Sequence, residues 1–187
     1  MTIITTFSEL YGIENRSEIK VVNIIDDDNF RGGVIDRLSL ENCTLFTIIT
    51  PKDVTLSINY LTLEKCQYFF IENVNVRVTL SFDKISKVVI KNSSVDSIDW
   101  EEVQELVIIK SELPDMYDQK IVNSLRLENV KVNDDMLFYN IKNVTMEGIT
   151  KGYNLILNDL ESFEVKIVLF QMFSSKKWEN LSWKTQK

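Results

Sequence analysis

The sequence repeats one short pattern of apolar residues seven times, and this repetition constrains the fold more than any other feature. The first two copies read IDRLSLENCTL and INYLTLEKCQY, and apolar residues fill their positions 1, 4 and 6. Five further copies start at Ile85, Val103, Val122, Ile141 and Leu160, and a weaker eighth lies at residues 16–26. One such unit cannot bury its apolar side alone. The copies must therefore stack into a solenoid with a continuous core.

The spacing of the copies predicts how the rest of each coil is built. The central apolar residues of the seven copies are spaced by 23, 27, 18, 19, 19 and 19 residues. A strand of about six residues and two turns leave only about eight residues to return, which is short for a helix. We expect a mainly β protein, a right-handed β-solenoid of about seven to eight coils with parallel strands. One short helical turn is expected at Asp99–Leu106, with Asp99 as its N-cap.

The pattern resembles the leucine-rich repeat consensus L-x-x-L-x-L-x-x-N/C-x-L, which the first two copies match at every position. The resemblance covers residues 16–172 and implies parallel strands along one side of a leucine-rich-repeat-like solenoid. The chain departs from the family in its repeats of 18 or 19 residues, which are shorter than the usual range of about 20 to 29. At the Asn/Cys position, Cys43 and Cys66 give way to Ser93, Ser111 and then aliphatic residues, so an asparagine ladder is not expected.

A chain of 187 residues suits one domain. We expect a single solenoid domain over residues 1–187, with an N-terminal cap at 1–15, repeats at 16–172 and a basic C-terminal cap or tail at 173–187. Caps are needed because the ends of a solenoid expose strand edges. The C-terminal segment either covers the end of the core with Trp178 and Trp183 or binds a partner.

Strand alternation identifies the residues that face solvent. It turns positions 4 and 6 of each copy inward and positions 3, 5 and 7 outward. Most outward residues are polar, but Val89, Val107 and Ile109 are apolar, and such anchors in a polar surround are typical of binding surfaces. The alignment of the copies predicts a partner-binding surface made of Tyr60, Thr62, Val89, Lys91, Glu105, Val107, Ile109 and Arg126. Two alternatives remain: cover by loops or the C-terminal tail, and a simple effect of β propensity.

The sequence contains no histidine, which excludes Ser-His-Asp, Cys-His and histidine-metal chemistry. Cys43 and Cys66 stand at the same position of successive coils, so a disulfide is sterically possible, but reduced thiols stacked in the core are favoured in a cytosolic protein. The carboxylates of Asp26–Asp28 and of Asp134 and Asp135 suit solvated loops better than catalysis or calcium binding. We predict no catalytic residue, metal site or cofactor.

The expected function is that of a non-enzymatic protein–protein interaction module: an inhibitor, immunity factor or adaptor. The predicted surface is flanked by the acidic residues Glu41, Glu64, Glu128 and Glu147, which favour a protein partner with a basic surface. A net charge of −7 argues against nucleic acid. The lack of a signal-like or membrane-spanning segment predicts a cytoplasmic location and no membrane partner. Two other functions remain open: a carbohydrate-binding or carbohydrate-cleaving β-solenoid that uses Asp/Glu and exposed Tyr, and a structural component of a larger assembly.

Overall fold

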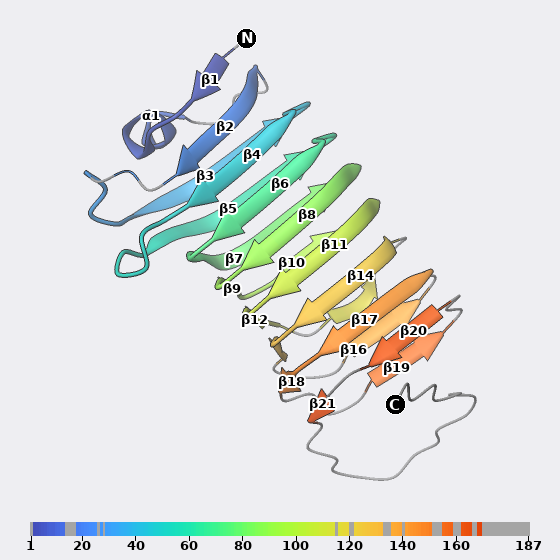
Figure 1. Cartoon of the computed structure of the whole chain (residues 1–187). Helices are drawn as coiled ribbons and strands as arrows, with labels where there is room; N and C mark the ends of the chain where they lie inside the picture. Colours follow the sequence, from blue (N-terminus) through green and yellow to red (C-terminus); the bar gives the residue numbers. More distant parts are fainter. Residues whose placement is uncertain are drawn as a thin grey trace.

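The chain winds into a parallel β-solenoid of about seven turns, as Figure 1 shows, and the part of the chain that the structure describes contains almost no helix. The computed structural model describes residues 2–13, 18–25, 27, 29–114, 116–119, 122–132, 136–139, 141–150, 155–158, 162–165 and 168–169. The expected fold class, a mainly β solenoid with parallel strands, is confirmed.

One long sheet, sheet A, runs along the whole described solenoid. Each of its strands pairs in parallel with the equivalent strand of the next coil. In spatial order it contains β1 (Thr2–Ile4), β2 (Ile19–Ile25), β4 (Leu45–Ile49), β6 (Tyr68–Glu72), β8 (Ile85–Lys91), β11 (Val103–Ile109), β14 (Val122–Glu128), β17 (Asn143–Glu147) and β20 (Ser162–Val165).

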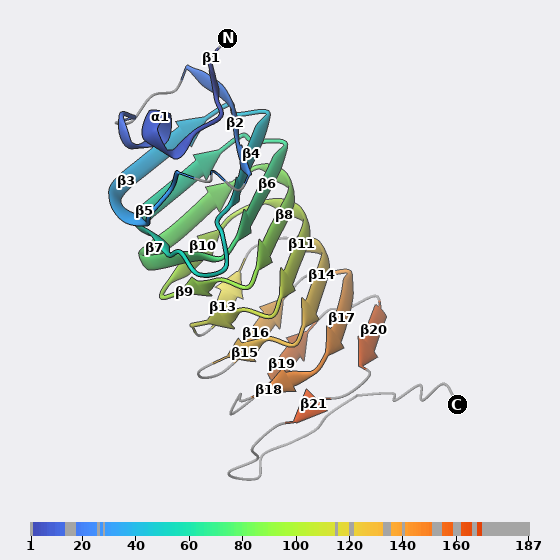
Figure 2. The ribbon, with the colours of Figure 1, turned by 60° about the vertical axis from the view of Figure 1, so that its left-hand side comes forward.

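The opposite side of the solenoid changes its shape along the axis. Sheet B begins with three long strands: β3 (Gly33–Glu41), β5 (Leu56–Glu64) and β7 (Val74–Asp83). It then continues as the two-residue strands β9 (Ser94–Val95), β12 (Glu112–Leu113), β15 (Lys131–Val132), β18 (Ile149–Thr150) and β21 (Val168–Leu169). The single long strand β7 pairs with both β9 and β10 (Ile98–Trp100), which are separate strands of the next coil. From this coil on, the chain therefore turns a second corner, which Figure 2 shows. Sheet C then forms the third side from β13 (Met116–Gln119), β16 (Met136–Tyr139) and β19 (Leu155–Asn158).

The core consists of columns of apolar side chains between these sheets. In sheet A, Phe46, Phe69 and Val88 are successive partners in one column, and Ile48, Ile71 and Ile90 form the next. All six are 0% exposed. Such stacking explains the repeat, because each coil covers the apolar side chains of its neighbour. Aromatic rings link the two sides of the core: Phe69 lies 5.3 Å from Phe46 and 6.2 Å from Phe82, measured between ring centroids.

The corner after many of the long strands is made by one residue in the left-handed region. After sheet B these residues are Asn42, Lys65 and Lys84; after sheet A they are Asn73, Asn92, Lys110, Asn129 and Gly148. Glycine and asparagine adopt this conformation at least cost, which accounts for most of the set. The same conformation is less favourable at the three lysines, because their Cβ atoms come too close to the following carbonyl oxygen.

The N-terminal end of the solenoid is covered by the short helix α1 (Phe7–Tyr11), visible above the first coil in Figure 2. Thr6 and Glu9 form a capping box, and Phe7 and Leu10 are buried. Phe7 stacks on Phe30 with ring centroids 3.8 Å apart. Among the described residues, no helix is long and apolar enough to cross a membrane. Residues 173–187, where the C-terminal cap or tail was expected, lie outside the described residues.

The alignment of the seven copies was wrong at one point, between the second and third. Leu38 and Leu61 share a column with Leu80 in sheet B, whereas Val88 belongs to the column of Phe69 in sheet A. The spacing of 27 residues was counted from Leu61 in sheet B to Val88 in sheet A, so it does not measure the length of one coil. The motif encodes a strand followed by a left-handed corner, and this unit occurs on both sides of the solenoid.

Two further expectations need correction. The segment from Asp99 to Leu106 forms no helical turn, because β10 and β11 occupy most of it. The leucine-rich repeat resemblance is not supported as a family assignment: that repeat follows its strand with a helix or 3₁₀ segment. Here the described return legs are built from strands.

Candidate functional site

The outer face of sheet A carries a group of apolar side chains interrupted by polar ones, and we call this group the apolar face. It spans β1, β2, β4, β6, β8 and β11, and register arranges its members in three columns. One column contains Ile3, Val21, Leu45 and Tyr68 and continues with Lys87 and Glu105. The middle column contains Asn23, Thr47, Phe70, Val89 and Val107, and the third contains Ile25, Ile49, Glu72, Lys91 and Ile109. Ile3 and Ile25 are 52% and 57% exposed.

Val89 and Val107 lie on this face although each is only 9% exposed. Their chain neighbours Val88, Ile90, Leu106 and Ile108 are completely buried in the core, so alternation turns the two valines outward. Their side chains are short and stand between longer ones on the same face. Low exposure here therefore reflects shielding by surface neighbours.

Two ion pairs flank the middle column. Lys87 Nζ lies 3.0 Å from a Glu105 carboxylate oxygen on one side, and Lys91 Nζ lies 2.9 Å from Glu72 Oε1 on the other. Each pair joins neighbouring strands and neutralises its own charge. The middle of the apolar face is thus bordered by polar groups without a net charge.

The same face is polar in the last three strands of sheet A. The columns continue through β14, β17 and β20 with Ser124, Arg126, Glu128, Asn143, Thr145, Glu147, Ser162 and Glu164. β14 and β17 have the same parallel pairing as the earlier strands, and their inward residues Leu125, Leu127, Val144 and Met146 are apolar and buried. The fold therefore does not require apolar residues on the outer face, and those on β1 to β11 need another explanation.

The structure divides the predicted surface residues between two sides of the solenoid. Val89, Lys91, Glu105, Val107, Ile109 and Arg126 all lie on the outer face of sheet A. Tyr60 and Thr62 lie on β5 in sheet B, where Tyr60 is the partner of Arg37 and of Thr79. The Arg37 guanidinium sits 5.1 Å from the centre of the Tyr60 ring. Tyr60 and Thr62 are therefore not neighbours of Val89, which corrects the predicted arrangement.

Sequence reasoning missed the larger part of the apolar face. The segments Leu45–Ile49 and Tyr68–Ile71 follow the first two copies of the motif and were therefore expected to be return legs, yet they lie in β4 and β6 of sheet A. The available signal was the interval from Phe69 to Val88, which equals the 19-residue period of the later copies. With that register, Phe70 is the residue in line with Val89 and Val107.

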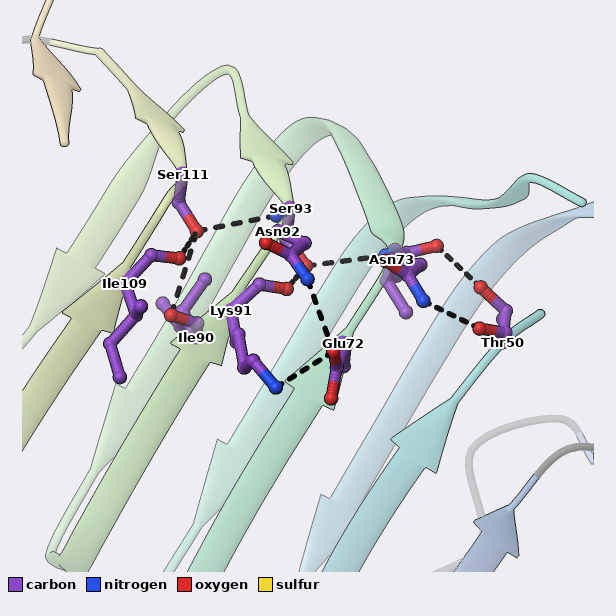
Figure 3. Close-up of polar contacts among 10 residues, drawn as sticks. Thr50, Glu72, Asn73, Ile90, Lys91, Asn92, Ser93, Ile109 and Ser111 are labelled. Atoms are coloured by element: carbon purple, nitrogen blue, oxygen red, sulfur yellow. Dashed lines mark hydrogen bonds and ion pairs between the residues drawn. The ribbon is translucent and has the colours of Figure 1, made fainter. Parts of the chain in front are cut away.

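A ladder of polar side chains supports the corner at one end of these strands, and Figure 3 shows it. The Ser93 N–H donates to Ser111 Oγ at 3.2 Å, and the Val74 N–H donates to Ser93 Oγ at 3.2 Å. Thr50 and Asn73 exchange two hydrogen bonds of 2.6 Å between side chain and backbone. These bonds satisfy backbone groups that the corners remove from the sheet ladder, so this row is structural.

Cys43 and Cys66 are both buried free thiols. Cys43 Sγ contacts the Leu45 carbonyl oxygen at 3.1 Å. The hydrogen bond with Cys43, together with burial, raises the pKa of the Cys66 thiol. A protonated, buried thiol is a poor nucleophile, so Cys66 suits core packing better than covalent chemistry.

Of the aspartates in the two acidic loop segments, the structure describes only Asp27. Asp27 makes a local turn, in which its side chain accepts a hydrogen bond of 3.1 Å from the Asn29 N–H. Asp26, Asp28, Asp134 and Asp135 lie outside the described residues. Among the described residues, no three acidic or cysteine side chains group closely enough to hold a metal ion.

No protein-family model matches the chain, and comparisons with curated proteins and with solved structures found no match either.

Proposed function

We propose that this protein is a non-enzymatic interaction module that binds a protein partner through the apolar face of sheet A. The observation that carries the proposal is the contrast along one sheet. Seven of the twelve outer residues on β4, β6, β8 and β11 are apolar, including Phe70, Val89 and Val107 in the middle column, whereas the described outer residues of β14, β17 and β20 are polar on the same backbone framework. Contiguous apolar surface with a polar border is typical of a protein-binding site.

The electrostatics of the whole chain favour a partner with basic residues. The net charge is −7, and long-range attraction would steer a basic protein toward the solenoid. The neutral ion pairs beside Val89 leave the contact itself to apolar side chains. An inhibitor, immunity factor or adaptor role in the cytoplasm accords with such a surface, and it belongs to the same proposal.

The proposal is tested by affinity capture from native lysate with matched variants. Phe70→Glu and Val107→Arg each place a charge in the middle column and should reduce capture by about tenfold or more. Thr145→Glu places a charge in the same column on the polar coils and should leave capture unchanged. Circular dichroism establishes that all variants remain folded. Equal capture by Phe70→Glu, Val107→Arg and the parent protein refutes the proposal.

A further inference from the structure

We infer that, when no other protein is bound, a second copy of this chain covers the apolar face in a symmetric dimer. The two faces pack against each other, and the two-fold axis runs parallel to the strands, between β6 and β8. This inference goes beyond the proposed function, because it concerns the same surface but needs no other protein. A bound partner and a second copy exclude each other, since both occupy one surface.

The position of the axis determines which residues of the two copies meet. It brings β6 over β8, β4 over β11 and β2 over β14 of the second copy. Rotation about an axis parallel to the strands also keeps each column of the face over the same column of the second copy, and every contact occurs twice. Sheets packed face to face keep their strands within about 30° of each other at a distance of about 10 Å, which this symmetry allows.

The centre of the contact places a protruding side chain over a low one. Phe70 faces Val89 of the second copy, and Val89 faces the other Phe70. The Phe70 side chain is half-buried, whereas Val89 is only 9% exposed and stands between the longer side chains of Lys87 and Lys91. A ring that enters this low position buries apolar surface on both copies. The adjacent strands extend the contact with two further facing pairs, Thr47 with Val107 and Ile49 with Ile109.

The axis also stacks one ion pair of the chain against its own copy. Lys91 Nζ on β8 lies 2.9 Å from Glu72 Oε1 on β6. The rotation exchanges these two strands, so Glu72 faces Lys91 of the second copy and Lys91 faces its Glu72. The four groups then form a square in which each charge has two opposite neighbours. This network attracts the second copy without requiring an unpaired charge in either chain.

A second ion pair lies along one border of the contact. Lys87 remains paired with Glu105, with Nζ and carboxylate oxygen 3.0 Å apart, and faces the ring of Tyr68 of the second copy. A lysine over a tyrosine ring makes a favourable cation–π contact. Glu105 faces Leu45, and its carboxylate stays in water because this column is the outermost one. The border therefore tolerates the charges that interrupt the apolar face.

The outermost strands, β2 and β14, form the remaining rim. Arg126 remains paired with Glu128 at 2.9 Å and faces Asn23 of the second copy. The side-chain oxygen of the exposed Asn23 is an acceptor for the guanidinium. Ile25 faces Glu128 at the edge, which adds little to the contact. Polar rims of this kind surround the apolar centres of protein interfaces.

Other positions of the axis are less favourable. An axis over β8 sets Lys87 and Lys91 each against its own copy, and an axis over β6 does the same with Glu72. An axis between β8 and β11 sets Glu72 against Glu128. An axis between β4 and β6 sets Glu72, Lys87 and Lys91 against apolar residues. Because like charges oppose association, the side-chain pattern favours the axis between β6 and β8.

The size of the contact predicts a weak dimer. Six strands at intervals of about 4.8 Å and three outer residues on each strand give a contact of about 24 by 13 Å. This area is smaller than the roughly 800 Å² per partner of a standard interface, so we expect a dissociation constant above about 10 µM. The net charge of −7 on each copy weakens the association further.

Sedimentation equilibrium from micromolar to millimolar concentration tests the inference with charge-exchange variants. Glu72→Lys and Lys91→Glu each set like charges against each other, so each variant alone should lose dimer affinity by tenfold or more. An equimolar mixture of the two should recover the dimer, because every charge then faces an opposite one. Glu112→Lys and Lys131→Glu change the ion pair between β12 and β15 of sheet B, and each should leave the dimer intact. A monomer at millimolar concentration, or a mixture without recovery, overturns the inference.

A double variant covers the case in which either single variant fails to fold by circular dichroism. Glu72→Lys combined with Lys91→Glu keeps one opposite pair within each chain. It should dimerise with itself and should not form mixed dimers with the parent protein, because both facing pairs would then carry like charges. Mixed dimers as abundant as the self-paired ones would overturn the proposed position of the axis.

The results separate this inference from the proposed function. If Phe70→Glu abolishes capture of a natural partner from lysate but the purified parent protein is monomeric at millimolar concentration, the interaction face stands and the dimer fails. If the purified protein dimerises as described but Phe70→Glu captures the same proteins as the parent, the dimer stands and the proposed function fails. A captured partner that binds the dimer without dissociating it contradicts the shared surface.

Discussion

Phe70 of β6 and Val89 of β8 are direct register partners on the outer face of sheet A, and Val107 of β11 follows them in the same column. Phe69 and Val88, one residue earlier, are register partners inside the core. Adjacent residues of one strand thus belong to two apolar surfaces with different roles. One of these surfaces holds the coils together, and the other faces outward.

This division predicts very different costs for two neighbouring phenylalanines. Phe69→Ala should lower the free energy of unfolding by about 3–5 kcal/mol, because it leaves a cavity between Phe46 and Phe82. Phe70→Thr should cost less than about 1 kcal/mol, because a threonine suits the outer face of a strand. Chemical denaturation measures both values. Similar costs for the two variants would mean that the chain itself covers Phe70, contrary to an open apolar face.

The serine ladder predicts a loss of stability from a very small change. Ser111→Ala removes the acceptor of the Ser93 N–H, and Ser93 is 5% exposed. An unsatisfied buried N–H should cost about 1–3 kcal/mol. Ser94→Ala is the matched control, because its hydroxyl donates to the partly exposed side chain of Asn75 and supports no buried backbone N–H among the described bonds. A denaturation midpoint for Ser111→Ala that equals that of the control would contradict a supporting role for the ladder.

The left-handed corners predict a stabilising substitution. Lys110 has a φ of 47°, where a Cβ is unfavourable. Lys110→Gly should raise the free energy of unfolding by up to about 1 kcal/mol, and Lys110→Val should lower it by about 1–2 kcal/mol. Ser86→Gly, within β8, should be mildly destabilising instead. Thermal unfolding of the three variants tests whether Lys110 adopts the left-handed conformation. Equal destabilisation by glycine at positions 110 and 86 would contradict it.

The capping box predicts a defined pH dependence. Hydrogen bonds from the Thr5 and Thr6 N–H groups lower the pKa of Glu9 below its ordinary value of 4.5. Since the folded pKa is depressed, Glu9 stabilises the protein above its unfolded pKa, and this contribution disappears as the pH falls through the folded pKa. The stability difference between the parent protein and Glu9→Gln should therefore shrink between pH 5 and pH 3. A difference that stays constant over that range would exclude this role.

Much of the architecture could be predicted from the sequence, because the core of a solenoid depends on residues that recur. The positions equivalent to Val88 and Ile90 are apolar in every later coil, and the short period excludes helical return legs. The sheet to which each copy belongs could not be predicted. The motif specifies a strand and a left-handed corner, and the same unit suits Leu38 in sheet B and Val88 in sheet A.

This ambiguity decided how much of the candidate site could be recognised. Val89, Val107 and Ile109 were identified because they come after the change of sheet, where the copies are in phase. Phe70 was missed because β6 was expected to be a return leg. Tyr60 was included because β5 was taken as the equivalent of β8, although the two strands lie in different sheets. Sequence alone gives the alternation within a strand but not the pairing between strands.

Site-specific photo-crosslinking tests the central claim most directly. Benzoylphenylalanine is introduced at position 70, at position 145 in the same column, and at position 62 on sheet B, and crosslinked products from native lysate are identified by mass spectrometry. The proposed interaction predicts a partner protein crosslinked from position 70 and not from positions 145 or 62. A partner crosslinked only from position 62 or 145 would contradict it, as would exclusive crosslinking of position 70 to the protein's own chain.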